Sequence, residues 1–69
     1  MKLIDKMTGK EAVVGNVYKS FRGEEYILKG GRPPLHDGST GRVWVVSNNE
    51  EKFTSEYFPS VFGMEWVND

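Results

Sequence analysis

Short runs of β-branched and aromatic residues make up most of this chain, and glycine, proline or asparagine interrupts each run before it reaches helical length. The runs are "KLID", "NVYKSF", "EYILKG", "RVWVVS", "KFTSEYF" and "MEWV". No window repeats apolar residues at the i, i+3, i+4 and i+7 spacing of an amphipathic helix. Strand-like runs with a turn signal about every 8 to 12 residues predict a small all-β barrel or sandwich.

Turn chemistry predicts where the first strands end. Thr8-Gly9 suits a turn after "KLID", and Gly15-Asn16 suits a bend or bulge before a strand over 16–21. Gly23 suits a tight turn, after which "EYILKG" forms the next strand.

The run "RVWVVS" is the most apolar in the chain. Val43 and Val45 alternate with Trp44 and Val46, so both faces are apolar, which predicts a central strand. The following Asn48-Asn49 predicts a two-residue type I′ turn into the strand "KFTSEYF".

The end of the chain and its length together predict the fold. Pro59 cannot donate to a strand ladder, so "KFTSEYF" should end at Phe58, and "PSVFG" predicts a short 3₁₀ turn before the last strand. A chain of 69 residues forms one domain, and an open sheet of this size would leave free edges and a bare apolar face. We therefore predict a single β-barrel domain over residues 1–69, with five or six strands in an SH3-like arrangement.

Composition narrows the class of protein. The chain contains no cysteine, which excludes a disulfide framework or a zinc–thiolate site. No apolar run approaches the roughly 20 residues that span a bilayer. Charges at Lys2, Asp5 and Lys6 interrupt the apolar core that a signal peptide needs. These features predict a soluble cytoplasmic protein with no membrane partner.

Charge is unevenly distributed along the chain. The net charge of -1 argues against a general nucleic-acid binder. Residues 1–42 hold eight Lys or Arg against five Asp or Glu, a formal +3, and residues 43–69 hold one against five, a formal -4. Two interpretations follow: an ordinary solvated surface, or an electrostatically two-faced molecule that docks on a partner.

No catalytic or ligand motif is present. His36 is the only histidine, and its neighbours Ser39 and Thr40 supply no positioned substrate or activated nucleophile. "GSTG" precedes a strand, whereas a phosphate-binding P-loop carries a lysine and opens a helix. One histidine and scattered carboxylates lack metal-ligand spacing. We expect no enzyme activity, no metal and no cofactor.

The stretch 30–41, "GGRPPLHDGSTG", is the longest connection. Pro33 and Pro34 stiffen it into an extended form, which lowers the entropy lost on binding. Leu35 either folds back and anchors the loop on the core or joins Arg32 and the prolines in a contact patch. Because binding residues concentrate on long loops, this loop is a candidate contact site.

Nine aromatic residues are more than a barrel this small can bury, because each carries roughly 150–250 Å². Exposed tyrosine and tryptophan are typical interface anchors. We predict an exposed cluster of Tyr18, Tyr26, Trp44 and Tyr57, with Arg22 and Arg42 near its rim. The alternative is that these are amphipathic barrel-wall residues whose hydroxyls face water.

Three blocks carry a resemblance: "KEAVVGNVYKSFRGEEYIL", "GSTGRVWV" and "EYFPSVFGMEWV". Together they resemble a family of small uncharacterised proteins encoded by tailed bacteriophages and prophages. The resemblance covers most of the chain and implies an origin rather than an activity.

A second resemblance is to SH3 domains. "FPSVF" is similar to the I-P-S-N-Y segment before their last strand, which would match Pro59 and Phe62 to residues that line a proline-peptide groove. The A-L-Y-D-Y opening, the tryptophan pair and the acidic loop of SH3 domains are absent. The resemblance therefore implies the fold and not peptide binding.

Two hypotheses for function follow. The first is a non-catalytic protein-interaction module that binds an unidentified protein through the exposed aromatics and the 30–41 loop, with homodimerisation through the same face as a variant. The second is a small β-barrel that binds single-stranded nucleic acid by stacking bases on aromatics in a basic groove. Its residues would be Tyr18, Phe21, Arg22, Tyr26, Arg32 and Arg42 from the +3 segment, with Trp44 two positions beyond that segment.

Overall fold

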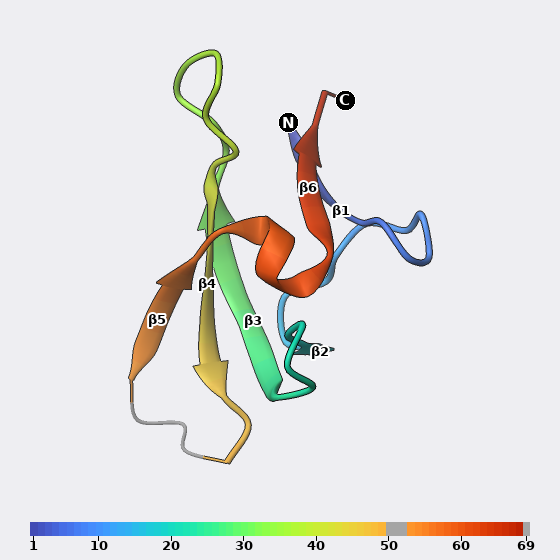
Figure 1. The fold of residues 1–69 in the computed structure, drawn as a ribbon, viewed down its shortest axis with the longest axis vertical. Coiled ribbons are helices and arrows are strands. Elements are labelled where there is room, and N and C mark those ends of the chain that lie inside the picture. The colour runs from blue at the N-terminus through green and yellow to red at the C-terminus, as the bar shows by residue number, and fades with distance from the viewer. Residues whose placement is uncertain (50–52, 69) are drawn as a thin grey trace.

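A computed structural model describes residues 1–49 and 53–68 of the chain. The described residues form β-strands and one 3₁₀ helix, and none of them lies in an α-helix, so the all-β prediction is confirmed (Figure 1). The elements are β1 (Lys2–Asp5), β2 (Val17–Lys19), β3 (Glu25–Arg32), β4 (Arg42–Ser47), β5 (Thr54–Tyr57), η1 (Pro59–Phe62) and β6 (Met64–Val67).

The strands form two antiparallel sheets. The larger sheet has the order β2-β3-β4-β5, and the smaller one pairs β1 with β6. The predicted closed barrel is therefore wrong. A closed barrel would need a strand of the smaller sheet to pair with a strand of the larger one. β1 and β6 pair only with each other, and β2 pairs with β3 through three residue pairs, so no ladder joins the two sheets. The apolar face of the larger sheet is covered instead by packing of the second sheet against it.

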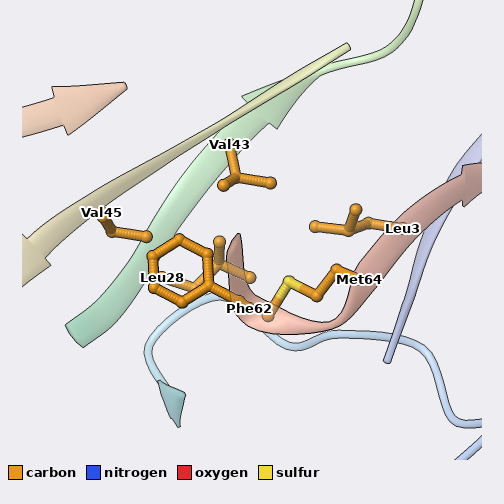
Figure 2. Packing of buried hydrophobic residues seen from close by; sticks show 6 residues of the cluster. All are labelled: Leu3, Leu28, Val43, Val45, Phe62 and Met64. Atoms are coloured by element: carbon orange, nitrogen blue, oxygen red, sulfur yellow. The ribbon is translucent and has the colours of Figure 1, made fainter. Parts of the chain in front are cut away.

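The core lies between the two sheets (Figure 2). Leu28 from β3 and Val43 and Val45 from β4 point toward η1 and the smaller sheet. Leu3, Phe62 and Met64 fill the space from the opposite side. β4 lies between β3 and β5, as predicted for the strand that is apolar on both faces.

Glycine turns lie where the sequence predicts them. Gly9 and Gly23 have φ angles of 73° and 83°, and the Gly23 N–H donates to the Ser20 carbonyl at 2.8 Å. Gly15 has a φ of 99° and forms the predicted bend. The strand after it spans only Val17–Lys19, shorter than the predicted 16–21.

The connection from β4 to β5 differs from the prediction. Val46 pairs with Thr54, so the ladder ends well before a two-residue turn at Asn48-Asn49 would form. A type I′ turn needs positive φ at both central residues, and no described residue other than glycine has one. The predicted type I′ turn is therefore wrong. Residues 50–52, which include the first residue of the predicted strand, lie outside the described residues.

The predicted 3₁₀ turn is confirmed at Pro59–Phe62. Proline fits its first position because it needs no donor there and its φ is already fixed. Gly63 ends the turn with a φ of 68°, and its N–H donates to the Ser60 carbonyl at 3.2 Å. This turn places Phe62 in the core and directs the chain into β6.

Trp66 of β6 connects the smaller sheet to the end of β3 and β4 that adjoins the loop between them. Its indole N–H donates to the Arg42 carbonyl at 3.3 Å. The ring lies against Gly31 and Gly41, where an added Cβ would come within 2.9 Å and 2.6 Å of indole carbons. Glycine at these two positions therefore makes room for the tryptophan.

Gly41→Ala should destabilise the protein strongly. A Cβ there would lie 2.5 Å from the Arg32 carbonyl oxygen as well as against the indole, and the φ of 76° disfavours any side chain. We expect a loss of roughly 2–4 kcal/mol in the free energy of unfolding, from overpacking added to the left-handed backbone.

Gly38→Ala is the matched control, because Gly38 has a φ of 86° and nothing within 4 Å of its Cβ position. It should lose only about 1–2 kcal/mol. Urea unfolding of both variants measures the difference. Equal losses would show that Trp66 does not pack against Gly41.

Candidate interaction site

The loop between β3 and β4 projects beyond the rest of the fold (Figure 1). β3 continues to Arg32, so the connection spans residues 33–41 and is shorter than the predicted 30–41. Leu35 is 74% exposed, so the alternative in which it anchors the loop on the core is wrong. Pro33 and Pro34 are half-buried at the base of the loop.

Hydrogen bonds within the loop are local. The Ser39 N–H donates to the His36 carbonyl at 3.2 Å, and the Gly41 N–H donates to the Ser39 hydroxyl at 3.3 Å. The Nδ1 of His36 lies 3.0 Å from the Asp37 carbonyl oxygen and donates to it in the tautomer that carries a proton there. An open hollow of about 490 Å³ between the loop and Trp66 leaves the loop tip accessible.

The four aromatics of the predicted cluster do not lie together. Tyr18, Tyr26 and Tyr57 are half-buried and pack against the core, whereas Trp44 points to the opposite face of the larger sheet. The Tyr18 hydroxyl accepts a hydrogen bond from the Val13 N–H at 2.8 Å, which ties the 12–16 segment to β2. The tyrosines therefore behave as amphipathic wall residues, the second of the two interpretations.

Tyr26 and Tyr57 meet at one end of the core. Their ring centroids are 5.7 Å apart, and both rings contact Phe62 edge to face, at 5.4 Å and 5.8 Å. Such pairs add stability beyond the area that they bury.

A hollow of about 240 Å³, the Tyr26 groove, opens beside these rings. Its lining consists of Ser20, Phe21, Arg22, Glu24, Tyr26, Tyr57 and Val61. The Phe21 N–H donates to the Val61 carbonyl at 2.9 Å, which fastens the turn at 20–24 to η1. Phe21 is 75% exposed, and the Arg22 guanidinium lies 5.6 Å from its ring centroid. Arg22 thus lies beside an exposed aromatic ring, but that ring is not one of the four in the predicted cluster.

The opposite side of the larger sheet carries Trp44, 38% exposed, and Phe58, 53% exposed. The Arg42 guanidinium lies 4.2 Å above the Phe58 ring, and its Nε is 3.4 Å from a Glu56 carboxylate oxygen. Arg32 pairs with Arg42 across the ladder. The structure therefore brings together three of the predicted residues, Arg32, Arg42 and Trp44, on a second surface.

The resemblance to SH3 domains assigned Pro59 and Phe62 to a peptide groove, but both are buried. No group of three or more His, Asp or Glu side chains that could hold a metal ion occurs in residues 1–49 and 53–68. In that same part of the chain no helix is long and apolar enough to cross a membrane.

Comparison with known proteins finds no matching family model, curated protein or solved structure.

Sequence reasoning missed three exposed aromatics: Phe53, Phe58 and, in the protein-binding hypothesis, Phe21. Phe58 alternates with Tyr57, so the period of two predicts that the two side chains face opposite ways. The register of β5 against β4 makes the side of Phe58 that of Trp44. Phe21 lies just before the turn at Gly23, and no sequence signal indicates that this turn packs on η1.

Tyr26 also provides a pH-dependent test of the aromatic cluster. A hydrogen bond with the Tyr57 side chain, together with burial, raises the pKa of the Tyr26 phenol above its ordinary value of 10.0. The fold therefore favours the neutral phenol. The stability that this preference contributes is present below pH 10 and is lost as pH rises through the folded pKa.

Tyr26→Phe should remove part of this pH dependence. Between about pH 8 and about pH 11 the free energy of unfolding of the unmodified protein should fall more steeply than that of the variant. Denaturant unfolding at the two pH values measures both slopes, and the other titrating groups cancel in the comparison. Parallel slopes would contradict the contact between Tyr26 and Tyr57.

Proposed function

We propose that this chain is a non-catalytic protein-interaction module whose main contact is the tip of the 33–41 loop. The observation that supports this best is Leu35, which is 74% exposed on a projecting loop. Burying a leucine side chain in a partner gains roughly 1.5–3 kcal/mol. Pro33 and Pro34 restrict the loop in advance, which lowers the entropy that binding costs.

The Tyr26 groove supplies a second contact in this proposal. It combines an exposed phenylalanine, tyrosine edges and an arginine, the residue types that dominate binding energy at interfaces. Its polar rim, with Ser20, Arg22 and Glu24, can orient a partner by hydrogen bonds. A module of this kind works by surface complementarity and makes no covalent bond.

The proposal also includes an SH3-like arrangement of the strands and an origin of the chain in phages or prophages. The pairing of the first strand with the last, the meander β2-β3-β4-β5 and the 3₁₀ turn before β6 support an SH3-like arrangement. The three sequence blocks support an origin among small proteins of tailed phages and prophages, acting in the cytoplasm of the bacterial host.

Leu35→Ser should abolish capture of the protein partner. The change removes the exposed apolar group and leaves the core untouched, so stability should be unchanged. The test is an affinity pull-down of the tagged chain from nuclease-treated bacterial lysate, with the retained proteins identified by mass spectrometry.

Met7→Ser is the matched control, because Met7 is 90% exposed and lies in the turn after β1. A protein retained by the unmodified chain and by Met7→Ser, and lost with Leu35→Ser, supports the proposal. A protein retained equally by all three contradicts a role for the loop tip.

A further inference from the structure

The outer side of the larger sheet carries a basic and aromatic surface that the protein-binding proposal does not use. It consists of Trp44, Phe58, Arg32 and Arg42, together with Lys29, which is exposed at the β-bulge between Gly30 and the buried Leu28, and we call it the Trp44 face. These residues come from β3, β4 and the residue that follows β5.

Its positive charge is only partly neutralised. Arg32 and Arg42 lie directly opposite each other on paired strands, an arrangement of like charges that is unfavourable unless an anion lies nearby. Glu56 pairs with Arg42 at 3.4 Å. Within residues 1–49 and 53–68, no carboxylate lies within ion-pair distance of Arg32 or Lys29. Two cations are therefore available to an anionic partner.

The aromatic rings are placed as platforms. The benzene ring of Trp44 lies over Gly30, where an added Cβ would come within 3.2 Å of its Cε3 atom, and the side chain remains 38% exposed. The Arg42 guanidinium lies over the ring of Phe58, and the Phe58 side chain is 53% exposed. The backbone on one side holds the Trp44 ring in place, and part of the ring stays accessible to solvent beside the cations. Another planar ring can therefore stack on it.

Shape distinguishes between two kinds of anionic partner. A protein partner anchors by inserting side chains into pockets. The described hollows lie around Tyr26, Phe21, the 33–41 loop and the side of Trp66 that faces Leu3, and neither Trp44 nor Phe58 lines any of them. A base needs only an exposed ring on which to stack, because every base has a π-face. Stacking also requires unpaired bases, which a duplex does not present.

We infer that the Trp44 face binds single-stranded nucleic acid, with Trp44 as the stacking residue and with Arg32 and Lys29 as phosphate contacts. This activity is separate from the protein contact proposed for the loop tip. With two phosphates neutralised, the logarithm of the binding constant should fall with the logarithm of salt concentration at a slope of about −1.4.

The experiment is a fluorescence-anisotropy titration of the full chain into a labelled oligothymidylate of about 12 nucleotides, at several salt concentrations. Trp44→Ala should weaken binding roughly 5- to 150-fold, the loss expected for one stacked base. Arg32→Gln should weaken binding and reduce the slope to about −0.7. Circular dichroism of each variant checks that the fold is retained.

Matched controls come from the Tyr26 groove, which also has an exposed aromatic ring and a cation, and from the loop tip. Phe21→Ala and Arg22→Gln remove an exposed ring and its neighbouring cation beside the Tyr26 groove, and Leu35→Ser alters the loop tip. All three should leave oligonucleotide binding unchanged. This separates the inference from the protein-binding proposal, which Leu35→Ser tests.

Four results of these titrations would overturn the inference: no binding at low salt, affinity that is independent of salt, equal affinity for the matched duplex, and equal losses in the control variants. Competition with poly-L-glutamate tests the acidic-protein alternative. If this polymer displaces the oligonucleotide as well as unlabelled oligothymidylate does, the face recognises charge alone and the inference is wrong.

Discussion

The packing of Trp66 against Gly31 and Gly41 connects the two sheets at the loop end of β3 and β4, beside the apolar core that lies between them. No ladder joins the sheets, so side chains must connect them. Trp66 comes from the two-stranded sheet, and its ring and N–H both contact the loop end of β3 and β4. The same contact supports the projecting 33–41 loop and the strands that carry the Trp44 face. This contact therefore helps to fix the loop and the strands that carry both proposed surfaces.

Local features of the fold followed from the sequence because their causes are local. Proline chemistry predicted η1, glycine predicted the turns at Gly9 and Gly23, and alternation of apolar residues predicted that β4 is central. Pairing of β1 with β6 joins residues more than fifty positions apart, and nothing in either run specifies its partner. The closed barrel was predicted because an open sheet would leave its apolar face bare. Packing a second sheet on that face meets the same requirement without closing the ladder.

The candidate site was predictable in its residue types but not in its grouping. Nine aromatics in a small chain required some to be exposed, and the structure exposes Phe21, Phe53 and Phe58 most. The prediction favoured tyrosine and tryptophan because they are typical interface anchors. The structure instead uses the tyrosines at the edge of the core, where the hydroxyl reaches solvent or a backbone partner. Alternation along β4 predicted that the Trp44 side chain lies on the opposite face of the strand from Val43 and Val45. Only the ladder register shows that Trp44, Arg42 and Arg32 belong to one surface.

Proton NMR of the folded chain tests the central contact most directly. The α-protons of Gly31 and Gly41 lie against the Trp66 indole, so they should show nuclear Overhauser effects to its ring protons and ring-current shifts away from ordinary glycine values. Gly38, which has no neighbour within 4 Å of its Cβ position, should show neither. Absence of these effects at Gly31 and Gly41 would mean that Trp66 does not join the two sheets, and the account of both surfaces would lose its support.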